Sequence, residues 1–131
     1  MGKPAQVWIK TKMGAPRTFD QNVPYLKEIA NLSSKGYFGK KGSSVRVRRI
    51  ESEDPVSMFS EFFATATLGA IDSKIDGKAV VRKMLCGTIV TGRITSSSDG
   101  SPAIDLNIVN SKYAKSQKLH FVKGKQHGNN K

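Results

Sequence analysis

The chain has a single cysteine, few aromatic residues and no long apolar run, and each scarcity removes a class of structure. Because Cys86 is alone, neither a disulfide within the chain nor a cysteine-based zinc site can form. The two histidines, His120 and His127, do not form a metal set, so we predict neither a metal nor a cofactor. Aromatic residues make up 8% of the sequence, which gives poor support for a stacking platform for single strands. No run reaches membrane-spanning length, and the first residues lack the apolar stretch of a signal peptide.

Acidic residues are also few, and this leaves a large positive charge. The 131 residues include 22 Lys and Arg against 10 Asp and Glu, for a formal net charge of +12. Such a charge opposes the compact state, so a polyanion such as a nucleic acid is the expected partner. Charge that merely aids solubility is the plain alternative. A membrane surface is less favoured, because no segment pairs a wide apolar helical face with a lysine-rich one.

The first half of the chain is expected to contain two helices within a single domain over residues 1–131. Residues 1–24 are predicted to be extended or linker-like, with a short strand over 6–12. A helix is predicted over PYLKEIANLSS, with Pro24 in its first turn, and a half-exposed strand over SVRVRRI. A second helix is predicted to begin at Pro55 in SEDPVSMFSEFFATATLGAI, with a broad apolar stripe that packs in the core.

Four strands are predicted from residue 78 onward, in the runs KAVVRKML, GTIVTGRIT, PAIDLNIV and QKLHFVK. Short loops between them favour an antiparallel meander. Cys86 is expected to be a small core residue, and residues 124–131 a flexible polar tail. The predicted fold class is therefore α+β, with N-terminal helices packed on a four-stranded antiparallel β-sheet.

Alternation along these strands predicts a polar face on the side of the sheet away from the core. The side chains expected to point inward are Val90, Ile94, Ile104, Leu106, Ile108, Leu119 and Phe121. The opposite face then gathers Arg93, Thr95, Asp105, Lys118 and His120. The strands therefore carry a polar cluster in addition to a core.

These residue types suit the cleavage of RNA without a metal. That reaction needs a base for the 2′-hydroxyl, an acid for the leaving oxygen, and cations or hydrogen-bond donors for the charged phosphorane. His120 is the expected acid or base and Arg93 the phosphate clamp, while Lys83 and Lys118 add positive charge. A single strand histidine is more often structural, and a single surface arginine is usually solvated. Their convergence on one predicted face favours a site. The basic loop over residues 35–49 is expected to hold the RNA backbone.

Part of the chain resembles a known group of toxins. Over residues 59–123, the segments SSDGSPAIDLNI and QKLHF resemble the C-terminal toxin domains of bacterial polymorphic toxins, found in contact-dependent inhibition, Rhs, wall-associated and LXG-type proteins. These domains are grouped with the ribonuclease superfamily of barnase, EndoU, the colicin ribonucleases and RelE. The resemblance implies a helix-plus-sheet fold of that kind and a metal-independent endoribonuclease that cleaves RNA, often tRNA. It also implies neutralisation by a cognate acidic immunity protein, and no membrane insertion by this domain.

The resemblance also assigns residues. The family's strand arginine corresponds to Arg93, its serine pair to Ser96 and Ser98, and its lysine and histidine to Lys118 and His120. The predicted catalytic residues are His120, Arg93 and Ser98, and the predicted RNA-binding residues are Ser96, Lys118, Lys83 and Thr95. The chain departs from the family at two positions. Gly92 replaces the aromatic residue of a Tyr-Arg pair, which is expected to alter substrate stacking, and Cys86 replaces the aspartate of a DGT turn.

Such domains belong to larger toxins that are secreted or carried on the cell surface, and they act in the cytoplasm of the target cell. The absence of an export signal in this sequence fits that expectation. Two alternatives remain open at this point. A non-catalytic RNA- or DNA-binding protein explains the charge equally well but not the clustering on one face, and an interaction protein would use its basic face to bind an acidic partner.

Overall fold

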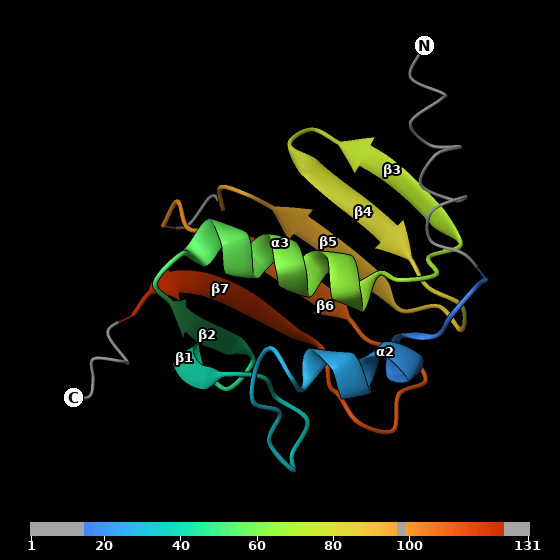
Figure 1. Cartoon of the computed structure of the whole chain (residues 1–131), viewed down its shortest axis with the longest axis horizontal. Coiled ribbons are helices and arrows are strands. Elements are labelled where there is room, and N and C mark those ends of the chain that lie inside the picture. The colour runs from blue at the N-terminus through green and yellow to red at the C-terminus, as the bar shows by residue number, and fades with distance from the viewer. Residues whose placement is uncertain (1–14, 97–98, 125–131) are drawn as a thin grey trace.

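A computed structural model describes residues 15–96 and 99–124, which form two α-helices and one seven-stranded β-sheet (Figure 1). The helices are α2 (Phe19–Leu26) and α3 (Pro55–Ala66). The strands are β1 (Lys40–Ser44), β2 (Val47–Ser52), β3 (Asp72–Asp76), β4 (Ala79–Lys83), β5 (Ile89–Arg93), β6 (Ala103–Asn107) and β7 (Gln117–Lys123). No helix in these two ranges has the length and apolar character needed to cross a membrane. The strand predicted over 6–12 and nearly all of the predicted tail lie outside the described residues.

The strand order in the sheet is β1-β2-β7-β6-β5-β4-β3, and the prediction of a four-stranded antiparallel sheet is wrong. The four predicted runs do form consecutive antiparallel neighbours, β4 to β7. However, β3 extends one edge, and β2 pairs in parallel with β7 at the other, followed by β1. The added strands hydrogen-bond to the otherwise open edges of β4 and β7, which satisfies their backbone groups.

Local capping explains where each helix begins. In α3, the Asp54 side chain accepts a hydrogen bond from the Ser57 backbone N–H at 3.1 Å, and Pro55 occupies the first turn, as predicted. In α2, Thr18 and Gln21 form a reciprocal capping box, so the helix begins at Phe19. The helix predicted from Pro24 onward is therefore misplaced, because Pro24 lies inside α2 and the helix ends two residues later.

Both helices cover the same face of the sheet, and the core lies between them and the strands (Figure 1). Four phenylalanine rings meet there with centroid separations of 5.2 to 5.9 Å, namely Phe38, Phe59, Phe62 and Phe121. The predicted apolar stripe of α3 is confirmed, since Phe59, Phe62, Phe63 and Ala66 are buried. The inward positions of Val90, Ile104, Leu106, Leu119 and Phe121 are confirmed as well.

Two residues predicted to be in the core are exposed. Ile94 is 57% exposed because β5 ends at Arg93, so alternation no longer fixes the side on which Ile94 lies. Cys86 is exposed in the turn between β4 and β5, where its φ is 75°. The apolar run around Cys86 is thus interrupted by a turn.

Candidate active site

The strand register brings most of the predicted polar residues onto the sheet face opposite the helices, which we call the open face. Across the paired strands β5, β6, β7 and β2, one row consists of Arg93, Ala103, His120 and Arg49. The adjacent row consists of Thr91, Asp105, Lys118 and Val47. The predicted sharing of one face by Arg93, Asp105, Lys118 and His120 is therefore confirmed. Because neighbouring strands are about 4.8 Å apart, Arg49 lies beside His120, and Arg93 lies two strands away on its other side.

Residues of the β5–β6 connection hold His120 in place. The Nδ1 atom of His120 lies 3.0 Å from the Ser101 hydroxyl oxygen and 3.5 Å from Oδ1 of Asp99. The same Asp99 oxygen accepts hydrogen bonds from the Ser101 hydroxyl at 2.6 Å, the Ser101 backbone N–H at 3.0 Å and the Ser96 hydroxyl at 3.0 Å. The His120 side chain is 9% exposed. Its position is therefore fixed by a connected hydrogen-bond network.

Asp99 remains ionised throughout the neutral pH range. Hydrogen bonds from the hydroxyl and then the backbone N–H of Ser101, with smaller effects of Ser96 and of the positive charge of His120, lower the pKa of Asp99 to about 2. All of these interactions favour the carboxylate over the carboxylic acid. A fixed negative charge therefore lies close to the imidazole of His120.

The network also determines which imidazole nitrogen carries a proton. Ser101 has a single hydroxyl proton, and it donates this proton in its 2.6 Å hydrogen bond to the Asp99 carboxylate. The Ser101 oxygen must then accept a hydrogen bond from His120, so Nδ1 is protonated. In the neutral ring, Nε2 consequently holds the lone pair, and no side chain or backbone group in 15–96 or 99–124 bonds to it.

The same geometry differs from that of a serine hydrolase. In a catalytic triad, the carboxylate and the serine hydroxyl contact opposite nitrogens of the imidazole. Here Ser101 and Asp99 both lie at Nδ1 of His120, and the Ser101 hydroxyl donates its hydrogen bond to Asp99 and not to the imidazole. Ser101 is therefore a positioning residue for His120, and the arrangement supplies no activated serine.

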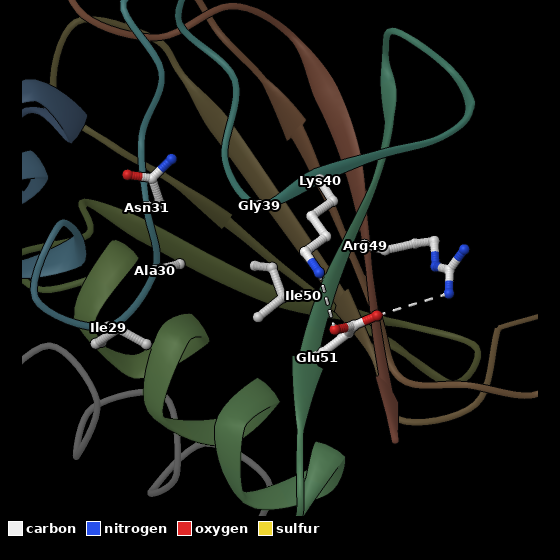
Figure 2. A pocket seen from close by; sticks show the side chains of 8 residues that line it. All are labelled: Ile29, Ala30, Asn31, Gly39, Lys40, Arg49, Ile50 and Glu51. Carbon is white, nitrogen blue, oxygen red and sulfur yellow. Dashed lines mark hydrogen bonds and ion pairs between the residues drawn. The ribbon is translucent and has the colours of Figure 1, made fainter. Parts of the chain in front are cut away.

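His120 lines a hollow of about 390 Å³ on the open face, which we call the His120 hollow. Its other lining residues include Asp99, Gly42, Ser43, Val47 and Arg49. The Arg49 side chain is 52% exposed, and its guanidinium is 3.9 Å from Glu51. Figure 2 shows Lys40 and Arg49 both extending toward Glu51 at a neighbouring hollow of about 340 Å³. Because exposed ion pairs of this kind are weak, Arg49 can exchange Glu51 for a phosphate group at low cost.

Arg93, the predicted phosphate clamp, is engaged with a carboxylate. Its Nη1 donates to Oδ2 of Asp105 at 3.0 Å, and both side chains are partly exposed. The register separates Arg93 from His120 by the small side chain of Ala103. Arg49 and Arg93 thus flank the histidine on opposite sides of one row, and Arg49 is the nearer cation.

The remaining predicted site residues lie in different surroundings. Ser96 is buried and donates to Asp99, so it supports the network around His120. Lys118 is partly buried on the open face, one row from His120. Lys83 is exposed on β4, two rows and three strands away from His120, so the structure does not bring it to His120. Thr95 is exposed beyond the end of β5, and Ser98 lies outside the described residues.

Gly92 lies on the core face of β5, so its expected influence on substrate stacking is wrong. A Cβ atom built at Gly92 would be 2.8 Å from two ring carbons of Phe63 and 3.2 Å from the ring of Phe59. An aromatic residue at this position would therefore point into the core and away from the open face. Close packing of α3 on β5 explains the glycine.

Asp99 and Ser101 were missing from the predicted site residues, and Arg49 was predicted only as part of the basic loop over residues 35–49 that holds the RNA backbone, not as a neighbour of His120. Asp99 and Ser101 belong to a polar turn, and the useful signal was the Asp-x-Ser spacing, in which a carboxylate accepts from the backbone two residues on. No local signal indicated that Arg49 lies beside His120, because only the parallel pairing of β2 with β7 places it there.

Comparisons with known proteins do not identify the chain. It matches no protein-family model, no curated protein and no solved structure. Within the described ranges, no three His, Cys, Asp or Glu side chains gather as a metal site requires. Its function is therefore inferred from the geometry of the open face and from the motifs that its sequence carries.

Proposed function

We propose that this protein is a metal-independent endoribonuclease and that His120 is its general base. The observation that carries the proposal is the hydrogen bonding of His120. Nδ1 donates to Ser101 beside the ionised Asp99, which leaves Nε2 as the basic nitrogen. An imidazole whose Nε2 lone pair is free can act as a general base. The net charge of +12 provides long-range attraction for RNA.

In the proposed reaction, Nε2 of His120 takes the proton of a ribose 2′-hydroxyl. The 2′-oxygen then attacks the adjacent phosphorus, and the bond between phosphorus and the 5′-oxygen of the next nucleotide breaks. The products are a 2′,3′-cyclic phosphate and a 5′-hydroxyl end. The leaving oxygen takes a proton from water, and the imidazolium returns its proton to solvent.

Two fixed charges favour this reaction. The imidazolium that forms at His120 lies 3.5 Å from Asp99, whose carboxylate is ionised because its pKa is lowered to about 2. The phosphorane gains negative charge, and Arg49, in the neighbouring position on β2, can bind two of its oxygens. Arg93 supplies a second guanidinium on the other side of the row.

We extend the proposal to the biological role of a toxin domain in competition between bacteria. The support is the likeness of SSDGSPAIDLNI and QKLHF to polymorphic toxins, because these segments contribute Asp99, Ser101 and His120 to the site. By this likeness, tRNA is the proposed substrate, a cognate acidic immunity protein the partner, and a larger secreted or surface toxin the carrier into the target-cell cytoplasm. The seven-stranded mixed sheet lends the likeness no support.

The test uses His120→Asn, because an asparagine amide nitrogen takes nearly the place of Nδ1 and can still donate to Ser101. This variant keeps the anchoring bond but lacks Nε2. Total cellular RNA is incubated with each protein in excess EDTA and examined on a denaturing gel. We expect discrete fragments from the wild type and at least about 100-fold slower cleavage by His120→Asn. Circular dichroism and thermal unfolding confirm that the variant is folded.

Two variants that each remove one positive charge, one beside His120 and one far from it, separate a catalytic effect on cleavage from the general attraction of RNA by the protein's charge. Arg49→Gln is expected to slow cleavage about tenfold or more, whereas Lys27→Gln, on the exposed C-terminal end of α2, is expected to leave the rate nearly unchanged. Intact RNA with the wild type at every protein concentration would contradict the proposal and favour a non-catalytic binding protein. Undiminished cleavage by a folded His120→Asn would contradict the role of His120.

A further inference from the structure

A second hollow lies on the open face, next to the His120 hollow. It has a volume of about 360 Å³, and its lining includes Arg46, Val47, Asp105, Asn107, Ser116 and Lys118, so we call it the Asp105 hollow. Val47 lines both hollows. Lys118 and His120 are two residues apart on β7, which places them about 6.6 Å apart along the strand and on the same face. The two hollows are therefore neighbours in the direction of the strands.

The two sides of the Asp105 hollow differ in chemistry. The exposed Arg46 lies at the β2 side and donates one hydrogen bond to the Ser116 carbonyl at 3.2 Å, and Lys118 on β7 lies between Asp105 and Val47. A carboxylate and an amide, Asp105 and Asn107, lie on β6 at the other side. Val47 on β2 lies beyond Lys118 in this row, and the exposed surface of the hollow is mostly apolar. The cationic groups, the apolar surface and the carboxylate and amide of β6 are complementary to the phosphate, the base face and the base edge of a nucleotide.

Asp105 gives this hollow a preference among bases. Its Oδ2 accepts from Arg93 at 3.0 Å, whereas no group in the described part of the chain is seen to bond to Oδ1. A carboxylate only accepts hydrogen bonds, so Oδ1 favours a base edge that presents an exocyclic amino group. Cytosine presents its N4 amino group there, whereas uracil presents O4, an acceptor, which would leave two acceptors facing each other.

We propose that the Asp105 hollow is a nucleotide subsite that binds the residue next to the cleaved bond and selects an amino-bearing base over uracil. The inference rests on the proposed function in one respect, namely that the ligand is RNA. The phosphate of that nucleotide lies against Lys118 and Arg46, and the scissile phosphate lies one row away at His120. The volume of the hollow is sufficient for one pyrimidine nucleotide.

The test measures binding without cleavage. Heptamers of 2′-O-methyl cytidine and 2′-O-methyl uridine, which lack the attacking hydroxyl, are titrated into 15N-labelled protein and followed by NMR. We expect the cytidine heptamer to bind about tenfold more tightly, with shifts at the backbone amides of Asp105, Asn107 and Ser116. Equal affinities, or shifts confined to other surfaces, would overturn the subsite.

Two variants of the ion pair give opposite expectations. Asp105→Asn is expected to abolish the preference for cytidine, because an amide can also donate to O4 of uracil, while total affinity holds or rises. Arg93→Ala is expected to weaken both heptamers and to keep the preference, because Asp105 remains. A preference that survives in Asp105→Asn would overturn the assignment. Cytidine monophosphate that binds as tightly as the heptamer would show a free-nucleotide site and would also overturn it.

The outcome is independent of catalysis. A preference for cytidine together with intact RNA in the EDTA assay would contradict the ribonuclease and leave the subsite standing. Cleavage at His120 together with equal heptamer affinities would contradict the subsite and leave the ribonuclease standing.

Discussion

Arg48 allows a stability prediction that can be worked out bond by bond. It is 8% exposed, and its guanidinium donates to three backbone carbonyls: Phe38 at 2.9 Å, Gly39 at 3.1 Å and Val45 at 3.1 Å. Its guanidinium carbon is 5.2 Å from the centre of the Tyr37 ring, and no acidic side chain in the described ranges pairs with it. These bonds tie β2 to the chain before and after β1, and so they hold the hairpin that lines the His120 hollow.

Replacing Arg48 by methionine keeps an apolar side chain of similar length but removes all three donors. The Phe38 carbonyl is buried, and the Gly39 and Val45 carbonyls are partly open to water. A buried acceptor left without a partner costs about 1–3 kcal/mol, and a partly exposed one costs less, so we expect a total loss of about 3 kcal/mol. Arg48→Lys restores one of the three bonds and is expected to lose about 1.5 kcal/mol.

Urea unfolding at pH 7, followed by circular dichroism, measures both variants. The control is Arg46→Met, two residues before Arg48, which removes an exposed guanidinium that donates to the Ser116 carbonyl and is expected to change stability by less than about 0.5 kcal/mol. The RNA cleavage rate is expected to be highest for the wild type, lower for Arg48→Lys and lowest for Arg48→Met. If Arg48→Met were as stable as Arg46→Met, or if Arg48→Lys and Arg48→Met were equally stable, the three hydrogen bonds of Arg48 would not contribute to stability as stated.

Four further predictions concern single positions. Gly92→Ala should lose about 1–3 kcal/mol in thermal unfolding, because its methyl group must displace the Phe63 ring; an unchanged melting temperature would show that the ring has room. Asp99 stabilises the fold above pH 3.8, and its effect is lost as the pH falls through about 2, so the stability gap between wild type and Asp99→Asn should narrow between pH 4 and 2; a constant gap refutes this. Cys86→Gly should gain about 1 kcal/mol, because φ is 75° at Cys86, and a loss would mean that its side chain packs. The neutral His120 imidazole should show protonated Nδ1 and bare Nε2 in 15N NMR; the reverse tautomer would contradict the network.

The sequence predicted those parts of the fold whose signals are local. The helix α3 follows from Asp54, Pro55 and its phenylalanine spacing, and β6 and β7 follow from apolar alternation. The strand β1, with sequence KKGSS, has no alternation, and its strand geometry comes from pairing with β2. The strand β3 was missed for a similar reason, since its one large apolar side chain, Ile75, is 72% exposed.

The site was predictable where strand alternation alone decides the face. His120, Lys118, Asp105 and Arg93 share the open face because each lies inside a regular strand. Arg49 was not predictable, because β2 pairs in parallel with a strand about 70 residues later, and nothing local encodes that pairing. The contacts that orient His120 depend on the side chains of a turn, whose geometry alternation does not describe.

The chemical nature of the product ends distinguishes the proposed 2′-hydroxyl nucleophile from any other. A short RNA and its fully 2′-deoxy counterpart are incubated with the protein in excess EDTA, and the products are analysed by mass spectrometry. Because the proposed nucleophile is the ribose 2′-oxygen activated by His120, we expect 2′,3′-cyclic phosphate and 5′-hydroxyl ends from the RNA and no cleavage of the DNA. Cleavage of the deoxy strand, or 5′-phosphate ends on the RNA, would show a different nucleophile and contradict the account.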